Sequence, residues 1–244
     1  MLNILILGGT QEAAKLATKA ANLPHIKVKV SLAGRTSQAA TSKYLRIGGF
    51  GGIAGLIEYL QAERIDLIID ATHAFAATIS HHAAIAAENL QLPRLMLIRS
   101  EWELVEGDKW IEVENIESAA KILPDLAKRV FLTIGRQELT AFSQLENIWF
   151  LMRMIEKPAS DIVLPQGLLL LKKGPFNKDS EKRLLEDYEI DTVVSKNSGG
   201  SATYAKIIAA RELGIKVVMV KRPMLPQGES VEDVESALEW IQEF

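Results

Sequence analysis

Short apolar runs alternate with helical patterns along almost the whole chain, and this alternation restricts the fold more than any other feature. The first run is Asn3 to Leu7, and a later run, Asp66 to Asp70, reads DLIID. Strands that alternate with helices form parallel sheets, because each helix returns the chain to the start of the next parallel strand. The pattern therefore predicts an α/β protein with two Rossmann-like parallel-sheet halves.

Further strands are expected over residues 28–32, 44–47, 95–98, 129–133, 149–154, 168–171, 191–194 and 217–220. Helices are expected over about 11–22, over 76–90 and over about 231–242. A further helix is expected to follow the glycine-rich stretch 48–52 and to end at about residue 63. The alternation is interrupted between Arg99 and Glu114 by a more charged segment that contains Trp102 and Trp110. We expect the domain junction there, with a first domain over 1–103 and a second over 104–244.

The residues that follow each strand are the candidates for a site, because ligands of open parallel sheets bind beyond the carboxyl ends of the strands. Gly8, Gly9 and Thr10 follow the first strand and precede a helix. Glycines there let the backbone approach a pyrophosphate, and the helix N-terminus supplies free N–H groups. The alternative is a plain tight turn between strand and helix.

Gly34, Arg35 and Thr36 follow the second strand, where an NAD site usually carries an acidic residue that holds the ribose hydroxyls. This chain has a basic residue instead, which suits the 2′-phosphate of NADPH. An exposed arginine in a turn is the alternative. We therefore expect NADPH as the cofactor, with NADH as a second possibility.

The next strand leads into Gly48-Gly49-Phe50-Gly51-Gly52, with Gly55 close behind. So many glycines cost backbone entropy, which a purely structural loop would rarely retain. Close approach of the backbone to a cofactor or to a large flat ligand explains them, and Gly49 and Gly51 are the expected contacts. A merely flexible loop is the alternative.

Asp70, Thr72 and His73 follow the DLIID strand and place three polar groups at the ligand edge of the first half. Asp70 and His73 are the candidates for catalysis, and Thr72 for cofactor binding. An Asp70–Thr72 pair that caps the following helix is the alternative. A metal site with His81 and His82 is not expected, because adjacent helical residues do not share a face.

Basic side chains end or follow every strand expected in the second half. They are Arg136, Arg153, Lys172, Lys196 and Arg222, and the run Asn197-Ser198-Gly199-Gly200 follows Lys196. The carboxyl ends of parallel strands share one edge, so these residues predict a binding site for a substrate with several negative groups. Chance placement of bases at strand ends is the alternative.

The overall charge offers no reason to expect nucleic acid or a membrane as partner. The formal net charge is -3, hydrophobic residues make up 48% of the chain, and there is no cysteine. The N-terminal apolar run is short and enters a Gly-Gly turn, as a buried first strand does. We expect a cytoplasmic protein that binds a small molecule and no metal, as a monomer or a small homo-oligomer.

Several motifs together resemble those of precorrin-6A and cobalt-precorrin-6A reductases. They are GGT, SLAGRT, GGFGG, DATHAFA, LTIGRQEL and SKNSGGSATYAKIIAARELGI, and they span nearly the whole chain in that order. The family usually has Pro after the histidine of DATHAFA, where this chain has Ala74. Ala lacks the fixed φ of Pro, so the turn that carries His73 is expected to be less rigid.

The resemblance implies two Rossmann-like domains with the active site in the cleft between them. It implies hydride transfer from NADPH to the macrocycle of precorrin-6A, or of its cobalt form, in cobalamin biosynthesis. The first domain would bind the cofactor, and the second would bind this polycarboxylate tetrapyrrole. The donor of the proton that must follow the hydride is Asp70, His73 or bulk water.

Two other functions compete with this reading. A short-chain dehydrogenase would need Tyr-x-x-x-Lys, but Tyr204 and Lys206 are only two residues apart and point to different sides of a helix. An NADPH-binding sensor without turnover would need no second anion site, which the basic residues of the second half predict. A P-loop NTPase is excluded because the chain lacks GxxxxGK[ST].

Overall fold

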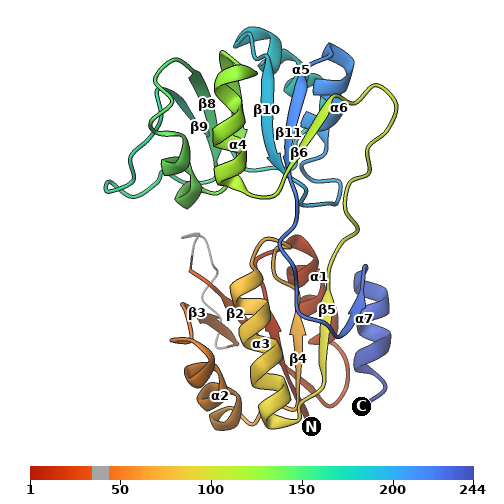
Figure 1. The fold of residues 1–244 in the computed structure, drawn as a ribbon. Coiled ribbons are helices and arrows are strands. Elements are labelled where there is room, and N and C mark those ends of the chain that lie inside the picture. The colour runs from red at the N-terminus through yellow and green to blue at the C-terminus, as the bar shows by residue number, and fades with distance from the viewer. Residues whose placement is uncertain (35–43) are drawn as a thin grey trace. The chain divides into compact units, whose positions relative to one another are not determined.

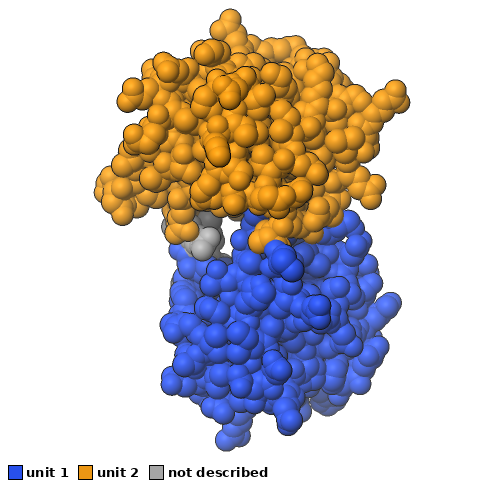
Figure 2. Space-filling model, viewed as in Figure 1, with its two compact units in different colours: residues 1–100, 224–244 blue, residues 101–223 orange. Residues whose placement is uncertain are grey.

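The computed structural model describes residues 1–34 and 44–244, which divide into two compact units. Unit 1 comprises Met1–Ser100 and Met224–Phe244, and unit 2 comprises Glu101–Pro223 (Figures 1 and 2). Each unit is a parallel sheet flanked by helices, which confirms the predicted α/β class with two Rossmann-like halves. Among the described residues, every helix is too short or too polar to cross a membrane.

Six parallel strands form the sheet of unit 1, in the spatial order β12-β5-β4-β1-β2-β3. Their bounds are β1 Leu2–Leu7, β2 Ile26–Leu32, β3 Leu45–Ile47, β4 Leu67–Asp70, β5 Arg94–Leu97 and β12 Glu229–Val231. The chain proceeds from β1 to β2 and β3 on one side, then crosses to β4 and β5 on the other. The strand order therefore reverses between β1 and β4, which is where ligands of such sheets bind.

Helices cover both faces of this sheet. α1 (Gln11–Ala20) and α7 (Val234–Ile241) lie on one face, and α2 (Ile53–Ala62) and α3 (Ala77–Leu90) lie on the other (Figure 1). Side chains of β1 alternate between the faces, so that its residues 4 and 6 join the first core and its residues 5 and 7 join the second. Burial on both faces explains why the strand is a continuous apolar run.

The sheet of unit 2 also has six parallel strands, in the order β6-β11-β10-β7-β8-β9. Their bounds are β6 Trp110–Val113, β7 Arg129–Thr133, β8 Trp149–Met154, β9 Gly167–Leu171, β10 Thr192–Lys196 and β11 Lys216–Val220. The strand order reverses between β7 and β10. The loops that follow these two strands therefore flank the ligand position of this sheet.

α5 (Lys178–Asp187) and α6 (Ala205–Leu213) pack against each other on one face of the second sheet, and α4 (Ile116–Ile122) lies on the other (Figure 1). Two short 3-10 helices, η1 (Leu123–Asp125) and η2 (Arg136–Phe142), complete the unit. η2 directly follows β7, so it begins at the ligand edge of the sheet.

The division of the chain differs from the expected one at its C-terminal end. Residues 224–244, which the sequence analysis assigned to the second half, pack with unit 1. β12 pairs with β5, and Arg94 Nη2 donates to the Gln227 carbonyl at 2.7 Å. The apolar stripe of α7, formed by Val234, Ala237 and Ile241, completes the core that α1 shares. Burial of this stripe explains why the chain returns to unit 1.

The elements that were not expected from the sequence include the strands β6 and β12, the helices α4 and α5, and the two 3-10 helices. β6 lies within the charged segment, and β12 exposes Glu229 and Ser230, so neither forms an apolar run. By contrast, the predicted bounds of β7 and β8 are those observed. Apolar strands were therefore predictable, including the exposed edge strand β9, whereas the more polar edge strands β6 and β12 were not.

Candidate functional site

Gly8, Gly9 and Thr10 form the turn between β1 and α1. A Cβ on Gly8 would lie 3.0 Å from Leu32 Cδ2, so packing against β2 accounts for this glycine. Gly9 has φ +123°, and no atom of the described residues lies within 4 Å of an added Cβ. The Thr10 hydroxyl caps α1 by accepting a bond of 3.1 Å and donates to the Ala71 carbonyl at 2.8 Å. Thr10 thus ties α1 to the end of β4, beside the open space at Gly9.

The glycine-rich loop after β3 contains two kinds of glycine. Gly48, Gly51 and Gly52 have φ values of +114°, +80° and +94°, where side chains other than glycine are rarely found. Their backbone conformation alone accounts for them. Gly49 lacks a positive φ, and no atom of the described residues lies within 4 Å of an added Cβ. Neither strain nor packing accounts for Gly49, so it is the loop position that most directly indicates space for a ligand.

We expect Gly49→Ala to weaken cofactor binding about tenfold without lowering the melting temperature. The added methyl group meets no atom of the described protein, but it would occupy the space in which a ligand approaches the backbone. Gly107→Ala is the control for a loss of stability alone, because Gly107 belongs to unit 2, is not a proposed cofactor contact, and has a φ of +90° that costs about 1–2 kcal/mol with any side chain. Unchanged affinity in the Gly49 variant would mean that no ligand passes over this position.

Gly34 ends the described part of the second strand's loop. It has φ +71°, and a Cβ there would lie 3.0 Å from Ile47 Cγ2, so both backbone and packing require glycine. Arg35 and Thr36 lie outside the described residues. Their contacts with a 2′-phosphate stay a prediction from the sequence.

Asp70 ends β4 and is buried, with 4% of its surface exposed. Its Oδ1 accepts from the Thr72 backbone N–H at 3.1 Å and from the Thr72 hydroxyl at 2.7 Å. The pair closes the turn after β4 and does not cap α3, which begins at Ala77 without a side-chain cap. Burial lowers the pKa of Arg94, and the negative charge of Asp70 opposes that shift. One carboxylate oxygen of Asp70 therefore holds both the backbone and the hydroxyl of Thr72 in this turn.

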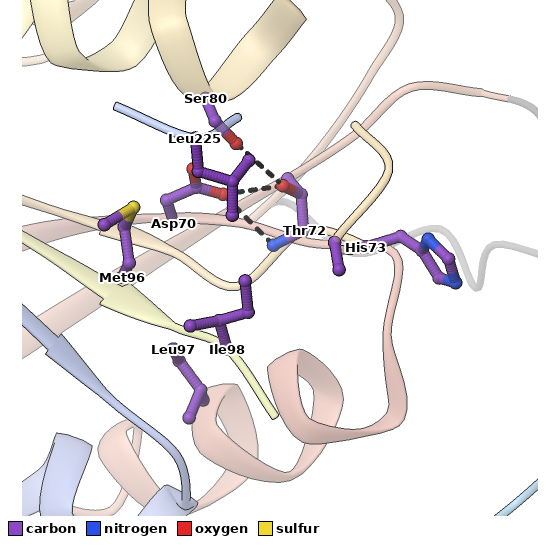
Figure 3. Close-up of a pocket in the computed structure, with 9 residues that line it drawn as sticks. Asp70, Thr72, His73, Ser80, Met96, Leu97, Ile98 and Leu225 are labelled. Atoms are coloured by element: carbon purple, nitrogen blue, oxygen red, sulfur yellow. Dashed lines mark hydrogen bonds between the residues drawn. The ribbon is translucent and has the colours of Figure 1, made fainter. Parts of the chain in front are cut away.

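A small pocket opens beside this pair in unit 1. Asp70 and Thr72 line it together with Ser80, Met96 and Leu225 (Figure 3). The Thr72 hydroxyl lies 3.4 Å from the Ser80 hydroxyl, so the polar side of the pocket is one connected network. Leu225 belongs to the segment that returns to unit 1, so this segment forms part of the pocket wall.

His73 also lines this pocket, but its ring points away from the Asp70–Thr72 pair (Figure 3). Its Nδ1 accepts a hydrogen bond from the Phe75 N–H at 3.2 Å. An accepting Nδ1 assigns the proton of the neutral ring to Nε2. His73 thus has a donor on the side of the ring opposite the Phe75 bond, and it forms no acid–base pair with Asp70 in this structure.

In unit 2, cations and carboxylates meet where the strand order reverses. Lys196, at the end of β10, is paired with Glu138 of η2, which follows β7. The other Glu138 oxygen accepts from the Gly135 N–H at 2.9 Å. Arg136 lies 3.8 Å from a carboxylate oxygen of Glu156. A substrate carboxylate that binds at this edge would therefore contact cations that already interact with acidic residues of the protein.

The sequence analysis missed the acidic partners of these bases. Besides Glu138 and Glu156, Glu101 lies 3.7 Å from Arg222. Of these three acidic residues, only Glu138 could have been singled out from the sequence, because it belongs to the LTIGRQEL motif together with Arg136. Lys172 is exposed, and no carboxylate of the described residues lies within 4.0 Å of its ammonium. It is the predicted substrate contact that the structure leaves most open.

Arg153, which the sequence predicts as a substrate contact, is buried and forms an ion pair in the structure. It lies within β8 and is 7% exposed. Its Nη1 donates to Glu181 Oε1 at 2.5 Å, and its guanidinium lies 3.6 Å from the centre of the Phe176 ring and 4.7 Å from that of Phe131. The side chain points into the core beneath α5, where its charge is neutralised by Glu181.

The side-chain amide of Asn197 is bonded within unit 2, to Trp102 and, through Nδ2 at 3.3 Å, to Glu101. Its Oδ1 accepts from the Trp102 N–H at 2.8 Å, and its Nδ2 donates to the Trp102 carbonyl at 3.0 Å. Arg222 Nε donates to the Asn197 carbonyl at 2.9 Å. Asn197 thus joins two segments that are distant in sequence, which the sequence analysis did not foresee.

The turn after Asn197 does not open directly into a helix. Gly199 and Gly200 have φ values of +67° and +73°, and α6 begins only at Ala205. Ser198 and Gly199 are buried. The helix N-terminus therefore does not lie beside Lys196 in the chain, and glycine is required here by the backbone.

A buried titratable group lies outside these edges. Lys206, at the start of α6, is 3% exposed, and its Nζ donates to the Thr203 carbonyl at 2.9 Å. Burial, together with the charge of Arg153, lowers the pKa of Lys206 to about 7, whereas Glu181 opposes the shift. Within residues 1–34 and 44–244, no group of three or more histidine or acidic side chains is arranged to hold a metal ion.

Comparison with known proteins gives one consistent family. The model of the family "Precorrin-6x reductase CbiJ/CobK" matches residues 3–242. A precorrin-6A reductase of Rhodococcus erythropolis is 46% identical over 244 residues, covering 99% of this chain and 98% of its own. One of Mycobacterium tuberculosis (strain ATCC 25618 / H37Rv) is 43% identical over 243 residues, with the same coverage.

A solved structure described as CobK precorrin-6A reductase superimposes with a TM-score of 0.92 at 37% identity. The match covers 100% of this chain and 97% of that one. A cobalt-precorrin-6A reductase of Methanocaldococcus jannaschii is more distant, with 25% identity over 98% of both chains.

Proposed function

This chain belongs to the precorrin-6x reductase CbiJ/CobK family, and from that premise we propose that it transfers a hydride from NADPH to the macrocycle of precorrin-6A or of its cobalt form. It is an oxidoreductase of cobalamin biosynthesis. The observation that carries the proposal is that the family likeness runs from residue 3 to residue 242, through both units. A likeness confined to unit 1 would support only a shared dinucleotide fold.

We assign the cofactor to unit 1, whose strand order is that of dinucleotide-binding sheets. Two observations support the fit, namely the open space at Gly9 and that at Gly49. The remaining proposed contacts are Gly8, Thr10, Gly34, Arg35, Thr36, Gly51 and Thr72. When bound, the reduced nicotinamide supplies the hydride, and the protein supplies orientation and electrostatics.

Arg35 carries the proposed preference for NADPH over NADH. A charge-assisted hydrogen bond to the 2′-phosphate contributes about 1.5–3 kcal/mol. We expect Arg35→Ala to raise the KM for NADPH on the order of tenfold to a hundredfold and to leave that for NADH nearly unchanged. Steady-state kinetics with each dinucleotide measure this. Equal use of both dinucleotides by the wild type would remove Arg35 from the proposal.

We assign the substrate to the carboxyl edge of the unit 2 sheet. Lys172, Arg136, Lys196 and Arg222 follow or end strands of this sheet, and a macrocycle with several carboxylates can engage several of them. Ser198, Gly199 and Gly200 supply backbone groups beside Lys196. We further propose that the protein acts in the cytoplasm as a monomer or small homo-oligomer, without nucleic acid or membrane partners.

The proton that follows the hydride is proposed to come from the edge formed after β4. His73 has its donor at Nε2, and Asp70 holds Thr72 in the turn that carries this histidine. On this proposal His73 passes the Nε2 proton to the macrocycle while its Nδ1, released from the Phe75 N–H, takes up a proton from water, and Asp70 keeps the turn in place. Bulk water is the alternative donor.

The proposal is tested by measuring NADPH oxidation with purified protein, in separate reactions with precorrin-6A and cobalt-precorrin-6A. We expect oxidation only when one of these macrocycles is present, and the faster reaction identifies the substrate form. A protein that binds NADPH but oxidises it with neither macrocycle would instead be a nucleotide sensor.

A further inference from the structure

Arg46 of β3 lies two residues before the glycine-rich loop, and its guanidinium holds the backbone of that loop. Nη1 donates to the Gly48 carbonyl, and Nη2 donates to the Gly49 carbonyl at 2.7 Å. The guanidinium also lies 3.9 Å from the centre of the Phe50 ring and 5.2 Å from that of Tyr59. A planar cation held by two bonds and two rings keeps two successive peptide groups in one orientation.

That orientation determines what the loop presents on its other side. In a trans peptide the carbonyl and the N–H point in opposite directions. Because the carbonyls of Gly48 and Gly49 point to Arg46, the N–H groups of Gly49 and Phe50 point away from it. Within the described part of the chain neither N–H donates a backbone hydrogen bond, and an added Cβ on Gly49 would meet nothing within 4 Å.

The charge of Arg46 favours an anion at this position. No carboxylate of residues 1–34 and 44–244 pairs with it within 4.0 Å, and residues 35–43 contain neither Asp nor Glu. Burial raises the pKa of Tyr59, and the charge of Arg46 opposes that shift, so this charge acts on its neighbours. Successive N–H groups beside a cation that no acid neutralises attract an anion.

We infer that Arg46 is a positioning residue that shapes the backbone of residues 48–50 into a cradle for a phosphate group of the nicotinamide cofactor. This inference rests on the proposed function, because it takes the cofactor as the source of the phosphate. Arg46 faces the carbonyl side of the loop, so it acts through the peptide groups. A cradle of N–H groups beside a cation fits the 2′-phosphate and the pyrophosphate alike. Binding of NADPH and of NADH distinguishes the two groups, because only NADPH carries the 2′-phosphate.

The test compares the full-length wild type with Arg46→Lys, Arg46→Met and the control Arg64→Lys. Arg64 is an exposed arginine just beyond the C-terminal end of α2. Lysine keeps the charge but lacks the planar fork that bonds two carbonyls at once. We expect NADPH to bind about tenfold more weakly to the lysine variant and up to about a hundredfold more weakly to the methionine variant. The control should bind as the wild type does.

Nicotinamide fluorescence gives each Kd at a temperature below the melting temperature of every variant. Equal weakening of NADPH and NADH assigns the pyrophosphate, and weakening of NADPH alone assigns the 2′-phosphate. With saturating NADPH, the lysine variant should retain wild-type kcat, because only cofactor binding is affected. If the methionine variant does not fold, the lysine variant decides the test.

Wild-type affinity of both folded Arg46 variants for both dinucleotides would overturn the inference, even if their melting temperatures fall. A lowered kcat with unchanged affinity would overturn it too. If the wild type itself binds neither dinucleotide, the proposed function fails. If the wild type binds NADPH and oxidises it with the macrocycle while the variants bind normally, the inference alone fails.

Discussion

Replacement of Arg153 by methionine is expected to lower the free energy of unfolding of unit 2 by about 3–5 kcal/mol. The Arg153 side chain is 5% exposed and that of Glu181 is 4% exposed, and their bond is 2.5 Å long. Among the residues that the structure describes, Glu181 Oε2 has no hydrogen-bond partner. Removal of Arg153 would therefore leave a buried carboxylate without the hydrogen bond and the charge that Arg153 provides.

Urea unfolding of the full chain, followed by tryptophan fluorescence, measures this effect. Trp102, Trp110 and Trp149 belong to unit 2, so the signal reports mainly on that unit. Lys172→Met is the matched control, because this base is exposed and its loss should change stability by less than about 0.5 kcal/mol. Wild-type stability of the Arg153 variant, with selective loss of tetrapyrrole binding, would restore Arg153 as a substrate contact.

Replacement of Lys206 by methionine is expected to have the opposite effect and to stabilise the protein at neutral pH. The pKa of Lys206 falls from 10.5 to about 7, chiefly because burial disfavours its charged form. Each pKa unit corresponds to about 1.4 kcal/mol, so the penalty is on the order of several kcal/mol. The groups that face it are Arg153, Glu181, the Thr203 carbonyl and the Trp102 ring.

The sign of the pH dependence follows from proton linkage. Below about pH 7 the lysine is charged in both states, and the full penalty of burying the charge is present. Between pH 7 and 10.5 the unfolded state binds more protons than the folded state, so wild-type stability rises with pH. The advantage of the Lys206→Met variant should therefore be largest at or below pH 7 and shrink toward pH 10.5. A destabilised variant, or a difference independent of pH, would contradict this account.

The parallel sheets could be predicted because their central strands are buried on both faces and are therefore continuous apolar runs. β7 and β8 are apolar runs, and their observed bounds are those expected from the sequence. The return of residues 224–244 to unit 1 could not be predicted in the same way. An amphipathic helix such as α7 specifies that it needs an apolar surface, but its sequence does not specify which of two similar sheets provides it.

The candidate site was predictable in unit 1 more than in unit 2. Glycines at the ends of strands have few explanations, and Gly9 and Gly49 do border open space. A base at the end of a strand has several explanations. Arg153 is a core ion pair whose partner Glu181 lies 28 residues away, and Lys196 pairs with Glu138 at a separation of 58 residues. Such pairs depend on tertiary packing, which single strand ends do not reveal.

The proposed function depends most on hydride transfer from the nicotinamide to the macrocycle. NADPH that carries deuterium at the transferable position of its nicotinamide ring, incubated with the protein and the preferred form of precorrin-6A, tests this step directly by mass spectrometry of the product. We expect the reduced macrocycle to carry the deuterium, in an amount equal to the NADPH oxidised. A reduced macrocycle without the label, or labelled NADPH that stays unoxidised while bound, would contradict the account.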